Sequence, residues 1–279
     1  LMDAIFARLS SLEGPAYLWY AIRIQQLPMA LFGLSLASAL LPALSRAFIR
    51  GSEEEYSKVL HFSLDKALCF LLPCSVALFA LAPAGVNLLF GRGGFSLEDT
   101  RQTIFCLWGY GLGLIPYVLV LLLVSAFHAR KNFSLPMKVA VLSMLFNVGL
   151  NAIFVMGLGL GAVSVAISTS ISAWFNCIFL YSPLKKFTLF SYETFKALVC
   201  CIGAGSLCVW VGRYFGMASI ASLFSSEFQV PREFLVQVAQ FLFQISVFLL
   251  SLLALAMCLK AKDLLSIAGL TKEKEAVRR

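Results

Sequence analysis

The sequence predicts an all-α integral membrane protein, a polytopic helical bundle. Hydrophobic residues make up 60% of the 279 residues and charged residues only 13%, which leaves too little polar surface to coat a water-soluble domain. Apolar stretches long enough to cross a bilayer core of roughly 30 Å recur along the whole chain. The strands of a membrane barrel are segments of about ten residues in which apolar and polar side chains alternate, and these stretches lack that pattern. Helices must therefore satisfy the backbone hydrogen bonds within the membrane.

Seven such stretches follow one another, separated by short polar connections. We expect membrane-spanning helices near residues 16–44, 60–90, 104–127, 137–156, 161–184, 195–215 and 234–259. Four prolines lie within or near these spans, where proline kinks a helix or marks its end. They are Pro28, Pro73, Pro83 and Pro116.

The placement of lysine and arginine orients the bundle, because cytoplasmic connections carry the excess of positive charge. Sixteen of the 22 Lys and Arg residues fall on one alternating set of connections and tails, five fall on the other set, and Arg23 lies inside the membrane. The richer set includes the C-terminal tail, which predicts a cytoplasmic C-terminus and an external position for the residues before Tyr17. The net charge of +8 follows from this asymmetry and does not indicate nucleic-acid binding.

The first residues look like the end of a helix whose earlier turns are missing. Residue 1 is Leu rather than an initiator Met, and the segment lacks the basic region that begins a signal peptide. We therefore expect the chain to be a fragment of a longer membrane protein.

Arg23 is the most informative residue, since it lies in an otherwise uncharged segment from residue 17 to residue 41. A guanidinium in hydrocarbon costs roughly several kcal/mol unless it faces water or an anion, so Arg23 indicates a site for an anionic substrate. Gln26 is one turn further on and shares its face. The alternative is an arginine that snorkels outward, because Arg23 is only about 12 Å along a helix beyond Pro15.

Other kinds of site find little support. The spans contain no convergent group of His, Asp or Glu, which argues against an enzyme. The eight cysteines show no metal-ligand spacing and are typical of small apolar packing residues. The glycine-rich segment 90–95 lacks the Lys-Ser/Thr pair of a phosphate loop, so it indicates a turn.

Several separated motifs resemble one transporter family. They are YAIRIQQLPMALFGLSLASALLPALS at 20–45, LFGRGGF at 89–95, AFHARK at 126–131 and LPMK at 135–138. In this order they are similar to the C-terminal half of the MurJ family of lipid II flippases, the mouse virulence factor family of the MOP exporter superfamily.

The resemblance implies two six-helix lobes followed by two further helices, of which this chain covers the end of the seventh helix through the fourteenth. Residues 1–15 would be the end of a truncated helix and an external loop, and residues 16–190 the bundle of the C-terminal lobe. Residues 191–262 would form the two additional spans, which help to form a groove for the lipid tail. Residues 263–279 would form a basic cytoplasmic tail.

The implied function is alternating-access transport of lipid II, the undecaprenyl-diphosphate-linked peptidoglycan precursor, across the bacterial inner membrane during cell-wall biogenesis. Its partners would be lipid II, membrane lipids and the missing N-terminal half. Arg23 aligns with a family arginine that faces the central cavity, where it would donate charge-assisted hydrogen bonds to the diphosphate. Ile22 and Gln26 stand where some relatives have acidic residues.

The resemblance also implies a possible sodium site. Asn147 and Asn151, spaced i and i+4 on one helical face, join Asp3 and the backbone carbonyl of Val163, and oxygen ligands of this kind suit a hard cation. Asn151 replaces a carboxylate found in such sites. Hydrogen bonding between packed helices is the alternative role of these asparagines. No other cofactor is implied, and the coupling source would be a sodium ion or the membrane potential.

Two other classes of function remain open. A MOP-superfamily exporter of drugs or of another polyprenyl-linked glycan would keep the bundle but lack the ordered motifs. A membrane scaffold would tolerate the loss of Arg23.

Overall fold

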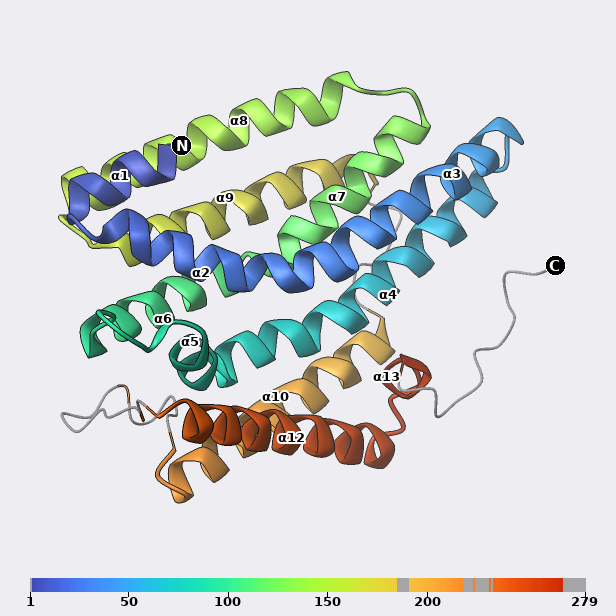
Figure 1. The fold of residues 1–279 in the computed structure, drawn as a ribbon. Coiled ribbons are helices and arrows are strands. Elements are labelled where there is room, and N and C mark those ends of the chain that lie inside the picture. Colours follow the sequence, from blue (N-terminus) through green and yellow to red (C-terminus); the bar gives the residue numbers. More distant parts are fainter. Residues whose placement is uncertain (1, 185–190, 218–222, 224–230, 232, 268–279) are drawn as a thin grey trace.

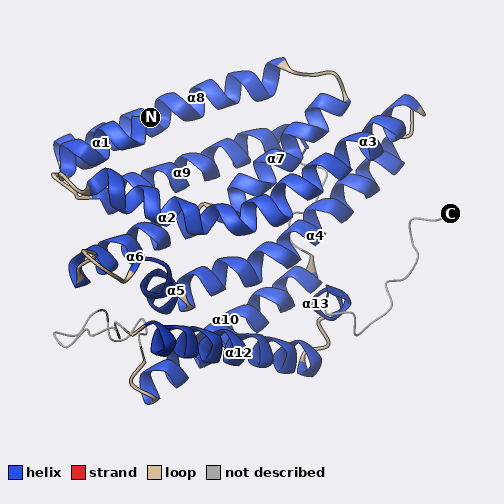
Figure 2. Cartoon of the chain, viewed as in Figure 1, coloured by secondary structure: helices blue, strands red, loops and turns tan. Residues whose placement is uncertain are grey.

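The computed structural model describes residues 2–184, 191–217, 223, 231 and 233–267 of the chain. All regular secondary structure in these residues is helical (Figure 2). Seven helical stretches are long and apolar enough to cross a membrane, which confirms the predicted fold class. They are Gly14–Ile49, Glu53–Ala80, Leu97–Ala129, Ser134–Gly157, Ala162–Leu184, Tyr192–Tyr214 and Phe234–Cys258.

Individual helices are shorter than the spans, since several spans are interrupted. The described helices, in chain order, are α1 (Met2–Ser10), α2 (Gly14–Pro28), π-helix η1 (Met29–Leu34), α3 (Ser35–Ile49), α4 (Glu53–Ala80), α5 (Ala82–Phe90), α6 (Leu97–Gly111), α7 (Leu114–Ala129), α8 (Ser134–Asn151), π-helix η2 (Ala152–Gly157), α9 (Ala162–Tyr181), 3₁₀-helix η3 (Ser182–Leu184), α10 (Tyr192–Tyr214), α12 (Phe234–Cys258) and α13 (Lys262–Ile267).

Two prolines mark places where the chain departs from a continuous α-helix. Pro28 ends α2, and the chain continues as η1, since proline has no N–H to donate to the preceding turn. The single span expected at 60–90 is wrong in its extent, because α4 ends at Ala80 and α5 begins at Ala82. Pro83 lies in the first turn of α5, where N–H groups have no intrahelical acceptor and proline is favoured.

Serine residues cap the first turns of three long helices. The Ser52 hydroxyl accepts from the backbone N–H of Glu55 at the start of α4. Ser96 and Asp99 form a reciprocal capping box at the start of α6, and Ser191 caps α10. These side chains accept hydrogen bonds from first-turn N–H groups that have no partner within the helix. Each cap thus fixes the residue at which the polar connection ends and the span begins.

Connections alternate between the two ends of the bundle (Figure 1). The α3–α4, α7–α8 and α12–α13 connections lie at one end, and the α1–α2, α5–α6 and α8–α9 connections lie at the other. The first group carries basic residues, among them Arg50, Arg130, Lys131, Lys260 and Lys262. Residues 268–279 of the predicted basic tail, and the basic residues at 185, 186 and 232, lie outside the described residues.

The core has α9 at its centre. One hydrophobic cluster joins α3, α4 and α7 to the last turns of α9, and a second joins α1, α2 and α6 to its first turns. The last two spans, α10 and α12, pack on each other and form a layer beside α4 and α5 (Figure 1). The fold therefore consists of a main bundle around α9 and a flanking helix pair.

Glycine allows α9 to approach the α6–α7 span closely. The Ser170 hydroxyl donates to the Gly109 carbonyl at 2.6 Å. A Cβ atom added at Gly109 would lie 2.8 Å from the Ala166 Cβ, and one added at Gly113 would lie 2.5 Å from the Ser170 Oγ. Small residues at helix contacts are how membrane helices gain close packing without a hydrophobic driving force. This contact, which we call the α9 seam, fixes the rotation of α9.

We predict that Gly109→Ala lowers the free energy of unfolding by about 1–3 kcal/mol, because the methyl group overpacks the α9 seam. The measurement is the thermal unfolding midpoint of the purified chain in detergent. Gly149→Ala is the matched control, since Gly149 lies in α8 and an added Cβ has nothing within 4 Å. We expect that change to be neutral or slightly stabilising. Equal midpoints for the two variants would contradict the close packing.

Candidate functional site

Five polar side chains from three helices meet between α1, α8 and α9, and we call them the Asp3 cluster. Asp3 accepts hydrogen bonds from the Asn151 amide (3.2 Å) and the Thr169 hydroxyl (3.0 Å). Asn147 accepts from the Asn151 amide (3.1 Å) and donates to Thr169 Oγ1 (3.2 Å). The Ser168 hydroxyl donates to Asn151 Oδ1. Asp3 is thus bonded to residues 148 and 166 positions away in the chain.

The cluster forms because each helix presents a polar face at the same level. Asn147 and Asn151 are one turn apart in α8, so both amides face the same neighbours. The side chains of Asn151 and Ser168 are fully buried, whereas Asp3 and Thr169 are half-buried. A polar group inside an apolar bundle costs free energy unless it is hydrogen-bonded, which explains why these residues meet.

The backbone carbonyl of Val165 in α9 also contacts the cluster. The hydroxyls of Ser168 and Thr169 each lie 2.9 Å from the Val165 carbonyl oxygen. Val163 lies in the first turn of α9, packed against the second hydrophobic cluster. The part of the Val163 carbonyl in a cation site, which the sequence resemblance implies, stays a prediction.

The arrangement offers the ligand chemistry of a hard monovalent cation. Carboxylate, amide, hydroxyl and carbonyl oxygens converge, and Asp3 is the sole charged member. No group of three or more His, Cys, Asp or Glu side chains occurs among the residues that the structure describes, so a transition-metal site has no support there. A cation would take the place of hydrogen-bond donors that now face Asp3. The residues present therefore fit a sodium ion.

Arg23 lies on the opposite side of α2 from the bundle core. Its side chain is exposed, and the guanidinium carbon lies 4.9 Å from the centre of the Trp19 ring. Arg23 also donates to Gln26 Oε1 at 3.4 Å, so the two predicted residues do share one face. Trp19 and Leu27, one turn on either side of Arg23, are 52% and 60% exposed. This face of α2 is thus open to whatever adjoins the chain.

Gln25 sets the direction of this face, although the sequence analysis did not single it out. Gln25 is 4% exposed and its amide donates to the Tyr110 carbonyl of α6 at 2.7 Å. Tyr17, two turns earlier, donates to Asp99 at 2.9 Å. These two bonds hold α2 against α6, and Arg23 consequently points away from α6. Two adjacent glutamines give no sequence signal that tells which is buried.

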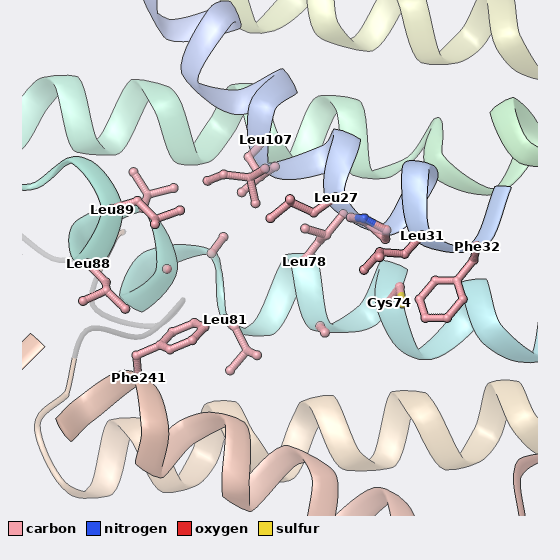
Figure 3. Close-up of a pocket in the computed structure, with 16 residues that line it drawn as sticks. Leu27, Leu31, Phe32, Cys74, Leu78, Leu81, Leu88, Leu89, Leu107 and Phe241 are labelled. Atoms are coloured by element: carbon pink, nitrogen blue, oxygen red, sulfur yellow. The ribbon is translucent and has the colours of Figure 1, made fainter. Parts of the chain in front are cut away.

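An apolar cavity of about 460 Å³ opens one turn beyond Arg23. Leu27 and Leu31 of the first span form one wall, Leu78 of α4 and Leu107 of α6 another, and Phe241 of α12 closes the cavity from the flanking helix pair (Figure 3). Its volume is in the range of small-molecule sites. Arg23 does not line this cavity, but Leu27, one turn further along α2, does.

Comparisons with known proteins agree on one family. The family described as "Lipid II flippase MurJ" matches residues 1–215. The "Probable lipid II flippase MurJ" of Chlamydia muridarum is 30% identical over 280 residues, covering 96% of this chain and 52% of that protein. The protein of the same description from Vibrio cholerae is 29% identical over 184 residues, covering 66% of this chain and 35% of that protein.

A solved structure shows the same architecture. "Lipid II flippase MurJ, inward closed conformation" aligns with a TM-score of 0.70 and 25% sequence identity, covering 89% of this chain and 48% of that chain. The chain spans about half the length of the Chlamydia relative and of this structure.

We predict that Asp3 and Asn151 stabilise the fold jointly. In a double-mutant cycle of Asp3→Ala, Asn151→Ala and the combined variant, the coupling free energy should be about 0.5–1.5 kcal/mol, the range of hydrogen bonds between membrane helices. The measurement is unfolding in detergent without sodium, so that only the direct network contributes. Strictly additive effects would contradict the contact between α1 and α8.

Proposed function

Because this chain belongs to the MurJ family of lipid II flippases, we propose that it forms one lobe of a transporter that moves lipid II across the bacterial inner membrane. The family consists of membrane transporters and not of enzymes. Lipid II carries a diphosphate between a glycan head and a polyprenyl tail. The proposal extends the family's activity to this chain and assigns the diphosphate to Arg23.

The observation that carries the proposal is the position of Arg23 beside the apolar cavity. Leu27 and Pro28, the next turn of α2, line that cavity. A planar guanidinium can donate two parallel hydrogen bonds to phosphate oxygens, and it remains charged at any physiological pH. The tail of a bound lipid would then follow the cavity wall toward α12. Gln26 adds a second polar group on the same face.

Alternating access requires a second bundle that rocks against the first about a central site. The chain covers about half of its relatives, and the exposed face around Arg23 is suited to form one wall of a shared cavity. We therefore propose that another bundle completes the transporter. An exporter of another polyprenyl-linked glycan would use the same charge and cavity, and the identity of the cargo distinguishes the two functions.

Orientation follows from charge. The basic connections lie at one end of the bundle (Figure 1), and we propose that this end is cytoplasmic, as the excess of Lys and Arg predicts. The C-terminus would then be cytoplasmic. The Asp3 cluster would lie nearer the external side, because Asn151 ends α8 and Thr169 lies in the first half of α9.

We further propose that the Asp3 cluster binds a sodium ion that couples to transport. Asp3, Asn147, Asn151 and Thr169 would supply side-chain oxygens, and Val165 the backbone carbonyl. Asp3 belongs to α1, which connects to α2 and thus to Arg23 through residues 11–13. An ion that holds α1 against α8 and α9 would favour the conformation in which these helices meet.

We predict that Arg23→Ala reduces translocation of lipid II about 10- to 100-fold, because charge-assisted hydrogen bonds to phosphate contribute about 1.5–3 kcal/mol. Arg23→Lys should also be impaired, since lysine keeps the charge but lacks the planar fork. The measurement is externally exposed lipid II in cells that depend on this protein, with membrane abundance measured in parallel.

Arg213→Ala is the control for this test, because Arg213 is exposed in the last turn of α10, away from the cavity. It should leave translocation unchanged. Normal translocation with Arg23→Ala at normal abundance would reject the diphosphate role. If Arg23→Ala stopped translocation of another polyprenyl-linked glycan but left translocation of lipid II normal, that glycan would be the favoured cargo.

We predict that sodium stabilises the purified 279-residue chain, whereas choline does not, by about 2.7 kcal/mol at a concentration 100 times the dissociation constant. Asp3→Asn should abolish this difference, because it removes the sole charged ligand and keeps the side-chain shape. Glu233→Gln is the control, since Glu233 is exposed at the start of α12 and should retain the sodium effect. Equal melting of the wild-type chain in both salts would leave hydrogen bonding as the role of the cluster.

A further inference from the structure

A second space, lined by polar and apolar side chains, adjoins the Asp3 cluster. It has a volume of about 320 Å³ and lies between α7, α8 and α9. Asn147 and Thr169, both members of the cluster, form part of its wall. The other polar lining residues are Tyr117, Ser143, Ser172 and Asn176. The space is therefore continuous with the proposed cation site.

The space runs along the helices in one direction. On α9, Thr169, Ala173 and Asn176 line it at i, i+4 and i+7, so they follow one face for two turns, or about 10.5 Å. On α8, Asn147 and Ala140 line it, also two turns apart. Both rows lead from the cluster toward the basic end of the bundle, where α8 begins and α9 ends.

Small side chains explain why the space exists. Ala140, Ser143, Ser172 and Ala173 occupy the positions where larger residues would close the contact between α8 and α9. Alongside this row, the ring of Phe175 stacks on Phe146 of α8 with centroids 4.7 Å apart. The two helices are thus joined by aromatic rings next to a row of small residues.

Asn176 has an unused acceptor at this space. Its Oδ1 atom is buried and has no hydrogen-bond partner among the described residues. A buried amide oxygen without a partner costs free energy, whereas water or a partly hydrated cation would satisfy it. A partly polar space of this volume has room for roughly ten waters at about 30 Å³ each. Because the oxygen itself is buried, the Asn176 side chain would have to turn toward the space to bind one of these.

We propose that this space is a hydrated vestibule through which a monovalent cation passes between the Asp3 cluster and the basic end of the bundle, with Asn176 Oδ1 as a ligand on the way. The inference rests on the proposed cation site of the Asp3 cluster. Asn176 provides an uncharged oxygen two turns from that cluster, and such an oxygen can replace a water of hydration without trapping the ion.

The first test measures whether water and cations reach the space. In the 279-residue chain in lipid vesicles, Ala173→Cys places a thiol on the vestibule wall, and native Cys177, buried one turn further in the hydrophobic core, is the internal control. A cationic, water-soluble methanethiosulfonate reagent labels accessible thiols, and peptide mass spectrometry separates the two positions. We expect residue 173 to react at least 10-fold faster than Cys177 and to be slowed by sodium but not by choline.

The outcomes separate the two proposals. Labelling of residue 173 as slow as that of Cys177 would overturn the vestibule, even if sodium still stabilises the chain through Asp3. Fast labelling that sodium does not slow would overturn cation passage. If sodium stabilisation is also absent, the Asp3 cation site itself fails.

The second test concerns Asn176. Asn176→Leu removes the amide oxygen with little change in shape, and the sodium concentration that halves labelling of residue 173 should rise about 10-fold. Ile178→Leu is the control, since Ile178 is 60% exposed on another face of α9 and should leave that concentration unchanged. The same half-protecting concentration in Asn176→Leu would show that Asn176 is not a ligand.

Discussion

The α9 seam is the contact on which the rest of the structure depends. Ser170 donates to the Gly109 carbonyl, and the glycines leave no room for α9 to rotate against α6 and α7. Successive residues of a helix point about 100° apart, so fixing Ser170 on one side directs Ser168 and Thr169 toward α1 and α8. The Asp3 cluster can form only there. Packing of small residues at one face of α9 thus determines the polar chemistry at the next.

Hydrogen bonding within the Asp3 cluster gives it two uses. Without an ion, its donors and acceptors satisfy one another, so α1, α8 and α9 stay together in an apolar environment. With an ion, the same oxygens would turn toward the cation. Asp3 would then hold α1 in place by binding the cation rather than by accepting hydrogen bonds. Because α1 leads directly into α2, the position of Arg23 would depend on which state is populated. This connection links the proposed ion site to the proposed substrate site through covalent geometry.

Hydropathy predicted the seven spans, and loop charge predicted which connections share an end, because both depend on local composition. The burial of Gln25 could not be predicted from the sequence, whereas Gln26 shares the face of Arg23, as its spacing predicted. Asp3 and Thr169 are hydrogen-bonded although they lie 166 positions apart in the chain, and the periodicity of the sequence cannot predict a contact between such distant residues. Pro83 indicated an interruption near the break between α4 and α5, but the sequence did not show that α5 packs on both α6 and α12.

The neighbours of Arg23 do not suffice to keep it in hydrocarbon. A guanidinium at the centre of a membrane helix costs about 2.5–3.5 kcal/mol on insertion scales. The contact with Trp19 contributes about 0.5–1 kcal/mol at an exposed site, and the long hydrogen bond to Gln26 at most about 1 kcal/mol. The remainder must come from water, another protein surface or an anion. In the proposed function the diphosphate of the lipid would supply that anion, one turn from the apolar cavity, and between transport cycles water would take its place.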